Sequence, residues 1–120
     1  MIHRLTMGHL SRDAIERRQA LAERPLDPAI VHRLLAELGA VDEQGRPTLD
    51  GEPVEEKAGA LTCRWWVAGY RNLVAEEFAL RLQQETGCVL ADVNRCRVVE
   101  PGELVGLNDE AVGARAKRAR

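Results

Sequence analysis

The chain has 120 residues, of which 45% are hydrophobic and 30% are charged. This length suits a single domain with its own core, and the composition is too apolar for a disordered chain. The formal net charge of −2 excludes a protein that holds nucleic acid through its overall charge. No segment approaches the ~20 apolar residues of a membrane-spanning helix, and residues 1–10 lack the apolar run of a signal peptide. We therefore expect no contact with membranes.

Two helices are predicted in the N-terminal third of the chain. The first is capped by Ser11 and is expected to end at Pro25. The second is capped by Asp27, with proline at the first helical position, and ends at Gly39. Apolar residues recur along the second helix at helical spacing, which predicts a buried stripe: Ile30, Val31, Leu34, Leu35 and Leu38.

An acidic connector follows, rich in glycine and proline. Residues 25–60 hold three Lys or Arg against eight Asp or Glu. The turn formers predict a short hairpin from Val41 to Leu49, turning at Gln44-Gly45, and a short helix from Pro53 through Lys57.

Residues 61–68 alternate in a period of two, which favours a strand. On a strand, the adjacent Trp65 and Trp66 point to opposite faces, so one can be core while the other is accessible. The alternative is one helix from Leu61 to Thr86, since aromatic and apolar residues also recur every four positions there. Gly69 weakens that alternative by about 1 kcal/mol relative to alanine, and Asn72 is a suitable N-cap for a separate helix.

A helix is predicted over residues 73–86, ending at Gly87. Phe78 lies on one of its faces, whereas Leu73 and Leu80 point nearly the opposite way. A helix that is apolar on two sides is expected to lie between two packed surfaces, either inside the fold or against a partner.

Three strands are predicted beyond Gly87, over residues 88–93, 96–100 and 103–107, with turns at 94–95 and 101–102. The predicted fold class is α+β: two N-terminal helices, an acidic irregular connector, and a strand-helix-three-strand unit that forms a small, mostly antiparallel sheet. Residues 1–111 are predicted to form one domain and residues 112–120 a flexible basic tail. The predicted core consists of Ile30, Leu34, Leu35, Leu38, Trp65, Val74, Phe78, Leu82, Val89 and Val98.

The cysteines favour neither a disulfide framework nor a metal site. Cys63, Cys88 and Cys96 are odd in number and widely spaced, which indicates a reduced, cytoplasmic protein. No C-x-x-C or H-x-x-x-H pair is present, and no cofactor is predicted. The single serine is assigned to a helix cap, and no complete catalytic motif occurs. The sequence leans away from an enzyme, with a small enzyme or metalloprotein built on the cysteines as the third hypothesis.

The leading hypothesis is a non-catalytic protein-interaction or regulatory domain that either self-associates, as a homodimer, or binds another protein. Trp, Tyr and Arg are the side chains enriched in interface hot spots, and exposed leucines extend such a surface. The candidate interaction residues are Arg64, Trp66, Tyr70, Arg71, Leu73 and Leu80.

A second hypothesis is a nucleic-acid-binding module, which a partial resemblance suggests. The pattern L-x-x-L-G-A-x-D-x-x-G-x-x-T-x-x-G is formed by Leu35, Leu38, Gly39, Ala40, Asp42, Gly45, Thr48 and Gly51. It resembles the helix-to-hairpin segment of winged-helix domains, including the helicase-associated region of DEAH-box helicases and some transcriptional regulators. The resemblance covers about a seventh of the chain and implies a wing hairpin preceded by a DNA-contacting helix. Here the wing is acidic, with Asp42, Glu43 and Asp50 against Arg46, and an acidic wing repels phosphate.

Two further features bear on nucleic acid. If residues 61–68 form a strand, Arg64 and Trp66 share a face, as in platforms that stack single strands. The basic tail adds four positive charges that would give weak, salt-sensitive binding: Arg115, Lys117, Arg118 and Arg120.

Overall fold

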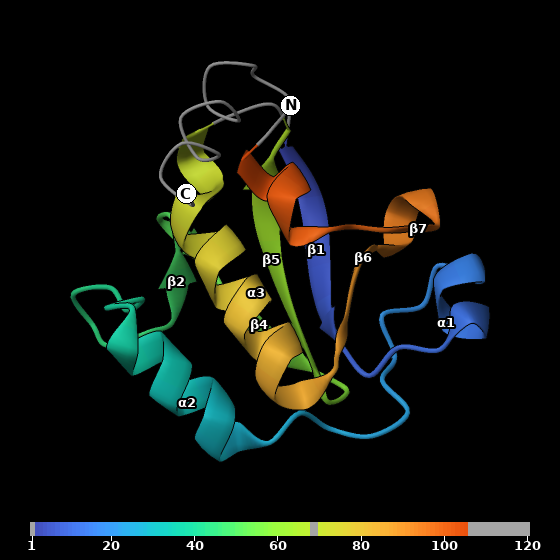
Figure 1. The fold of residues 1–120 in the computed structure, drawn as a ribbon, viewed down its shortest axis with the longest axis horizontal. Helices are drawn as coiled ribbons and strands as arrows, with labels where there is room; N and C mark the ends of the chain where they lie inside the picture. Colours follow the sequence, from blue (N-terminus) through green and yellow to red (C-terminus); the bar gives the residue numbers. More distant parts are fainter. Residues whose placement is uncertain (1, 68–69, 106–120) are drawn as a thin grey trace.

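A computed structural model of the chain describes residues 2–67 and 70–105, with Tyr70 represented by its backbone. Its centre is a five-stranded antiparallel sheet in the order β4-β5-β1-β6-β7 (Figure 1). The strands are β1 (Ile2–Gly8), β4 (Glu55–Lys57), β5 (Ala60–Trp66), β6 (Val89–Asp92) and β7 (Arg97–Val98). A separate pair consists of β2 (Thr48–Leu49) and β3 (Glu52–Pro53). The α-helices are α1 (Arg12–Glu16), α2 (Pro28–Glu37) and α3 (Leu73–Thr86), and the 3-10 helices are η1 (Tyr70–Asn72), η2 (Val93–Arg95) and η3 (Pro101–Val105).

One face of the sheet carries the main core. Figure 1 shows α3 lying across β5 and β1, with α2 beside it and η3 near its start. Leu5, Trp65 and Phe78 are almost fully buried between these layers. Because side chains alternate along a strand, the neighbours of Leu5 and Trp65 point to the other face of the sheet.

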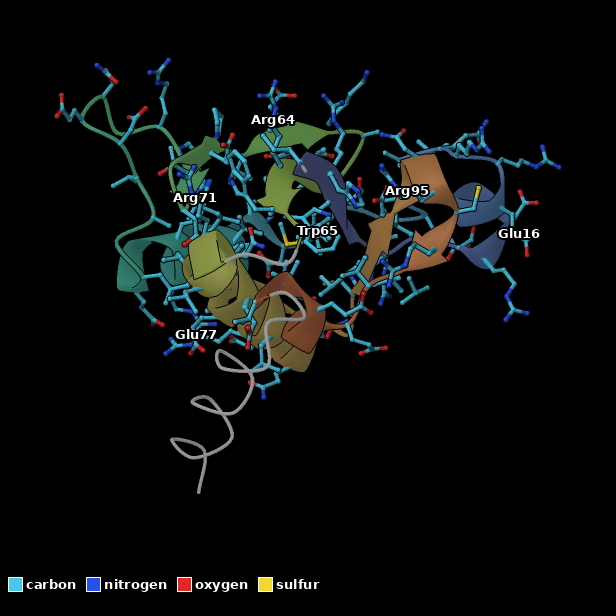
Figure 2. The ribbon with its side chains drawn as sticks, turned by 90° about the horizontal axis from the view of Figure 1, so that it is seen from above. Glu16, Arg64, Trp65, Arg71, Glu77 and Arg95 are labelled. Atoms are coloured by element: carbon cyan, nitrogen blue, oxygen red, sulfur yellow. The ribbon has the colours of Figure 1, made fainter. Side chains whose placement is uncertain are left out.

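The other face of the sheet is only partly covered. Around α1 and the loop after it, a smaller apolar cluster packs on the ends of β5 and β6. Its buried members are Leu10, Ile15, Ala60, Ala91 and Val93. The rest of this face, over the first half of β1 and the second half of β5, is not covered by a described α-helix (Figure 2), although η1 contacts β5 and η2 contacts β1.

The α+β class and the mostly antiparallel sheet are confirmed, but the predicted order of elements is only partly correct. The chain does not open with two helices, because β1 precedes them and forms the middle of the sheet. Leu5 and Met7 face the core, and the core-facing position before them is occupied by His3. A polar residue at that position interrupts the apolar alternation that would mark a strand.

The helix that Ser11 caps ends much earlier than predicted. Ser11 does accept a hydrogen bond from the Ala14 N–H, but α1 ends at Glu16 and not near Pro25. Arg18 adopts the left-handed conformation (φ 58°), which stops the helix without the glycine that usually marks such an end. The following Leu21 is 55% exposed.

The helices α2 and α3 begin and end close to the predicted residues. Asp27 caps α2 through its carboxylate, and Gly39 and Gly87 both have positive φ at the helix ends. The strand prediction for residues 61–68 is confirmed over β5, so the single long helix is wrong. Trp65 is buried and Trp66 is half-buried, as opposite faces of a strand require.

Three predictions in the remaining segments are wrong. Residues 53–57 belong to β3 and β4 and not to a helix. Residues 103–105 lie in η3 and not in a third C-terminal strand, because Pro101 and Gly102 begin a 3-10 turn that continues. Val98 was predicted to lie in the core but is 51% exposed, whereas the next residue, Val99, is fully buried. Ile30, Leu38, Val74 and Val89 are only partly buried.

The start of α3 is capped by a residue from the connector. The sequence predicted Asn72 as its N-cap, but Asn72 makes no capping bond to the helix. Instead the Asp50 carboxylate accepts hydrogen bonds from the N–H groups of Val74 (3.0 Å) and Ala75 (2.8 Å). Among the described residues, no helix is long and apolar enough to cross a membrane.

Candidate functional site

The uncovered part of the sheet gathers basic and aromatic side chains from β1 and β5. These strands pair in a register that places Ile2 opposite Trp66, Arg4 opposite Arg64 and Thr6 opposite Thr62. Figure 2 shows Arg64 on the side of the sheet away from α3, whereas Trp65 points inward. We call this surface the open patch, formed by Arg4, Lys57, Arg64, Trp66 and Arg71.

Two arginines lie directly across from each other at the centre of the open patch. Residues that face one another on antiparallel strands have Cβ atoms about 5 Å apart, and like charges there are destabilising. Arg4 and Arg64 are both exposed. Within residues 2–67 and 70–105, neither forms an ion pair with a carboxylate. Their repulsion is thus not offset by an ion pair within the described residues.

An aromatic and a guanidinium are stacked at one end of the open patch. The Arg71 guanidinium carbon lies 4.6 Å from the centroid of the Trp66 ring, within the range of a cation–π interaction. The buried side chain of Asn72 accepts a hydrogen bond from the Trp66 N–H (2.8 Å) and donates one to the Trp66 carbonyl. Asn72 therefore holds the end of β5 against η1 and brings Arg71 to the ring.

Two adjoining hollows of about 190 and 210 Å³ lie on the same face. They share Arg4, Glu55 and Thr62, so together they form one continuous depression. The charged side chains that line them are four cations and two acids: Arg4, Arg18, Lys57 and Arg64 against Glu52 and Glu55. The depression is thus locally basic on a chain whose net charge is negative.

The structure divides the predicted interaction residues between two surfaces. Arg64, Trp66 and Arg71 meet on the open patch, whereas Leu73 and Leu80 lie on α3, which packs on the opposite face of the sheet. These leucines are 41% and 37% exposed.

Some predicted residues lie outside the described part, and some patch residues were not predicted. The side chain of Tyr70 and the tail residues Arg115, Lys117, Arg118 and Arg120 lie outside the described residues. Sequence reasoning missed Arg4 and Lys57, because only the pairing of β1 with β5, and of β4 with β5, places them on the same face as Arg64. It also missed Arg18, which reaches the depression from the loop after α1. The alternation of Ile2, Arg4 and Thr6 was the one available signal.

A second polar cluster, on the core side of the sheet, was also missed. Asp92 is fully buried; one carboxylate oxygen lies 3.3 Å from His3 Nδ1 and accepts a hydrogen bond from Arg95 (3.4 Å). His3 packs edge-on against Trp65. Burial, and then the charge of Arg95, lowers the pKa of His3 against the opposing effect of Asp92. We assign this cluster to structure, since it joins β1 to β6 and η2.

The three cysteines lie in different surroundings. Burial raises the pKa of the Cys63 thiol to about 12, with smaller contributions from Asp50 and Glu52. Burial also raises the pKa of Cys88. Cys96 is exposed, and its sulfur lies 3.4 Å from Arg18 Nε. No disulfide joins them, and the described residues contain no group of three His, Cys, Asp or Glu side chains arranged to hold a metal ion.

These surroundings predict that one thiol reacts in the folded protein. At about pH 8, iodoacetamide is expected to alkylate Cys96 and to spare Cys63 and Cys88, because the thiolate is the nucleophile and the buried thiols stay protonated. Mass spectrometry should show one adduct on the native protein and three after denaturation in guanidinium. A Cys96→Ser variant should take up none while folded; rapid native modification of Cys63 would contradict the buried placement.

The segment that resembles a winged helix folds locally as a helix followed by β structure. After α2, an isolated bridge joins Val41 to Pro47, and β2 pairs with β3. Asp42 closes the intervening turn by accepting hydrogen bonds from the Arg46 N–H and side chain. Asp50 of the same segment caps α3. Acidic side chains of this segment thus have internal structural partners.

Comparisons with protein-family models, with curated proteins and with solved structures found no match to this chain.

Proposed function

We propose that the protein is a non-catalytic interaction domain that holds a negatively charged partner on the open patch. The observation that carries this proposal is the pairing of Arg4 with Arg64 across β1 and β5. Like charges placed opposite each other cost about 0.2–1 kcal/mol of stability. Because neither arginine forms an ion pair within the described residues, an anion that binds between the two guanidinium groups relieves their repulsion.

The chemistry of the open patch suits a phosphate or carboxylate. Arginine presents a planar fork of donors that matches either group bidentately, and two forks side by side double this capacity. Lys57 and Arg18 extend the positive charge along the depression. The net charge of −2 does not oppose such binding, since exposed charges beyond about 8–10 Å are screened at physiological salt.

Reversing the charge of one arginine of the pair is expected to weaken anion binding without lowering the stability of the fold. Arg64→Glu places a carboxylate opposite Arg4, so the variant is expected to unfold at the same urea concentration as the wild type or a higher one. Its retention on immobilised heparin, a polyanion without bases, is expected to fall, with elution at clearly lower salt. The matched control is Arg12→Glu, which makes the same change of net charge on exposed α1, beside β7.

The comparison of the two variants decides the proposal. Equal loss of retention in Arg12→Glu and Arg64→Glu would show that heparin senses net charge and not the open patch. Wild-type protein that passes through heparin at about 20 mM salt without retention would overturn the proposal outright.

A second candidate function is self-association through α3. Leu73 and Leu80 are seven residues apart, so they lie on one stripe of the helix at about 10 Å separation. Both are more than one-third exposed on the face that does not pack on the sheet. Exposed leucines on one stripe are typical of a helix that packs on a partner helix.

Substitutions on this stripe test self-association. The wild type is expected to sediment as a dimer at about 100 µM, and Leu73→Glu/Leu80→Glu as a monomer, because a charge at a buried apolar contact opposes association. Leu21→Glu is the matched control, since Leu21 is 55% exposed on the loop after α1. A monomeric wild type at this concentration would exclude the dimer.

A further inference from the structure

We infer that the anionic partner of the open patch is a single-stranded nucleic acid, with a base stacked on Trp66 and Arg71 and a phosphate held by Arg4 and Arg64. This inference rests on the proposed function and names the class of its ligand. It is carried by the juxtaposition of a stacking surface with a pair of arginines on the same face of the sheet.

The stacking surface is what favours a nucleic acid over an acidic peptide. Trp66 is half-buried and lies opposite Ile2, which is 39% exposed. The side chains of Asp and Glu have no aromatic face to stack on such a surface. Every nucleobase, by contrast, has a π-face that stacks on aromatic rings and on guanidinium planes. Arg71 is exposed and already stacks on Trp66, so the pair offers both kinds of plane.

The order of residues along the strands matches the order of groups in a nucleotide. On this face the cross-strand pair of Ile2 and the stacking residue Trp66 comes first, and the arginine pair Arg4 and Arg64 comes next along the strands. Residues two apart on one strand lie about 7 Å apart, which is the order of the distance between a base and the phosphate of its own nucleotide. The next residue of β5 on this face, Thr62, is half-buried and lines the depression, whereas its partner Thr6 is fully buried.

The shape of the patch favours a single strand over a duplex. Sequence readout in a duplex needs a helix or a two-stranded ribbon that enters a groove. The open patch is a sheet face with a shallow depression, and the bases of a duplex are already stacked on each other and unavailable to Trp66. Glu52 of β3 and Glu55 of β4 line one side of the depression and repel phosphate, so the nucleic acid is expected to lie over β1 and β5.

The test compares probes that carry the same charge with and without bases. Fluorescence anisotropy at about 20 mM salt would follow a labelled ten-nucleotide oligothymidine, a ten-unit abasic deoxyribose phosphate and a glutamate decapeptide. Oligothymidine is expected to bind at least about tenfold more tightly than the abasic strand, since stacking of one base has effects of this order. A self-complementary duplex of equal length is expected to bind more weakly than oligothymidine.

Variants assign the two parts of the interaction. Trp66→Leu is expected to bring oligothymidine down to the affinity of the abasic strand and to leave abasic binding unchanged. Arg71→Gln, at an exposed position outside the strands, is expected to lose part of the same preference and serves if Trp66→Leu does not fold. Arg64→Glu is expected to weaken both strands alike, because it acts on phosphate.

Each outcome separates this inference from the proposed function. Equal binding of the abasic strand and oligothymidine would overturn the nucleic-acid inference and leave a polyanion site. Tighter binding of the glutamate peptide would also overturn it, in favour of an acidic protein partner. If the wild-type protein binds none of these probes and is not retained on heparin, the proposed function itself is wrong.

Discussion

Asn72→Ala is expected to lower the free energy of unfolding by about 2–4 kcal/mol, since it leaves two part-buried backbone groups of Trp66 without their partner, at about 1–3 kcal/mol each. The side chain of Asn72 is 1% exposed and bonds both the N–H and the carbonyl of Trp66. Alanine removes both bonds and provides no replacement. Urea denaturation followed by circular dichroism would measure the difference.

The control for this prediction is an exposed asparagine. Asn94→Ala in η2 changes the same side chain at an exposed position and is expected to stay within about 0.5 kcal/mol of the wild type. In Asn72→Ala, affinity for oligothymidine is expected to fall as well, because the end of β5 that carries Trp66 is no longer tied to η1. A stability of Asn72→Ala equal to that of Asn94→Ala would contradict the assigned role.

Asp50→Ala is expected to lower the free energy of unfolding by about 1.5–3 kcal/mol through two separate effects. Loss of the cap on α3 accounts for about 0.5–2 kcal/mol, as at other helix N-termini. The left-handed conformation of residue 50 (φ 54°) adds about 1 kcal/mol, because alanine tolerates it less well than aspartate does. The thermal midpoint and the urea midpoint should both fall.

A graded set of replacements distinguishes the two effects. Asp50→Asn keeps one acceptor oxygen and tolerates positive φ, whereas Asp50→Gly keeps the conformation and loses the cap. The expected order of stability is wild type, Asn, Gly, Ala. An alanine variant as stable as the asparagine variant would show that α3 needs no cap from the connector.

The pH dependence of the Asp50→Asn comparison has a defined sign. Burial raises the pKa of the Asp50 carboxyl, and hydrogen bonds from the N–H groups of Ala75 and Val74 oppose this. A carboxyl whose pKa is higher in the folded state binds more protons there than in the unfolded state. The stability of the wild type relative to Asp50→Asn should therefore be greatest below the ordinary aspartate pKa and decrease as pH rises through the raised one.

Local signals explain which parts of the fold could be predicted from the sequence. The start of α2 at Asp27 and its end at Gly39 depend on residues within the helix or next to it, and those signals were sufficient. The opposite faces of Trp65 and Trp66 likewise follow from the geometry of any strand. These features need no knowledge of the rest of the chain.

Long-range pairing explains what could not be predicted. The cap of α3 comes from Asp50, 24 residues before the helix N–H that it accepts from. Arg4 and Arg64 become neighbours only through the register of two strands whose paired residues are 60 positions apart. The local pattern was sufficient to predict an interaction surface that contains Arg64, Trp66 and Arg71. It could not add Arg4 to this surface, and it wrongly placed Leu73 on it.

The central place of β1 also affects how the molecule reaches its native state. β1 pairs with β5 on one side and β6 on the other, and even its nearest pair, Met7 with Leu61, spans 54 positions. Contacts of such sequence separation are slow to form, since a long loop must close before any pairing is gained. Until residues 60–92 have been synthesised, β1 has two unpaired edges and exposes Leu5 and Met7. A ribosome-bound or refolding chain is therefore most prone to aggregate through this strand.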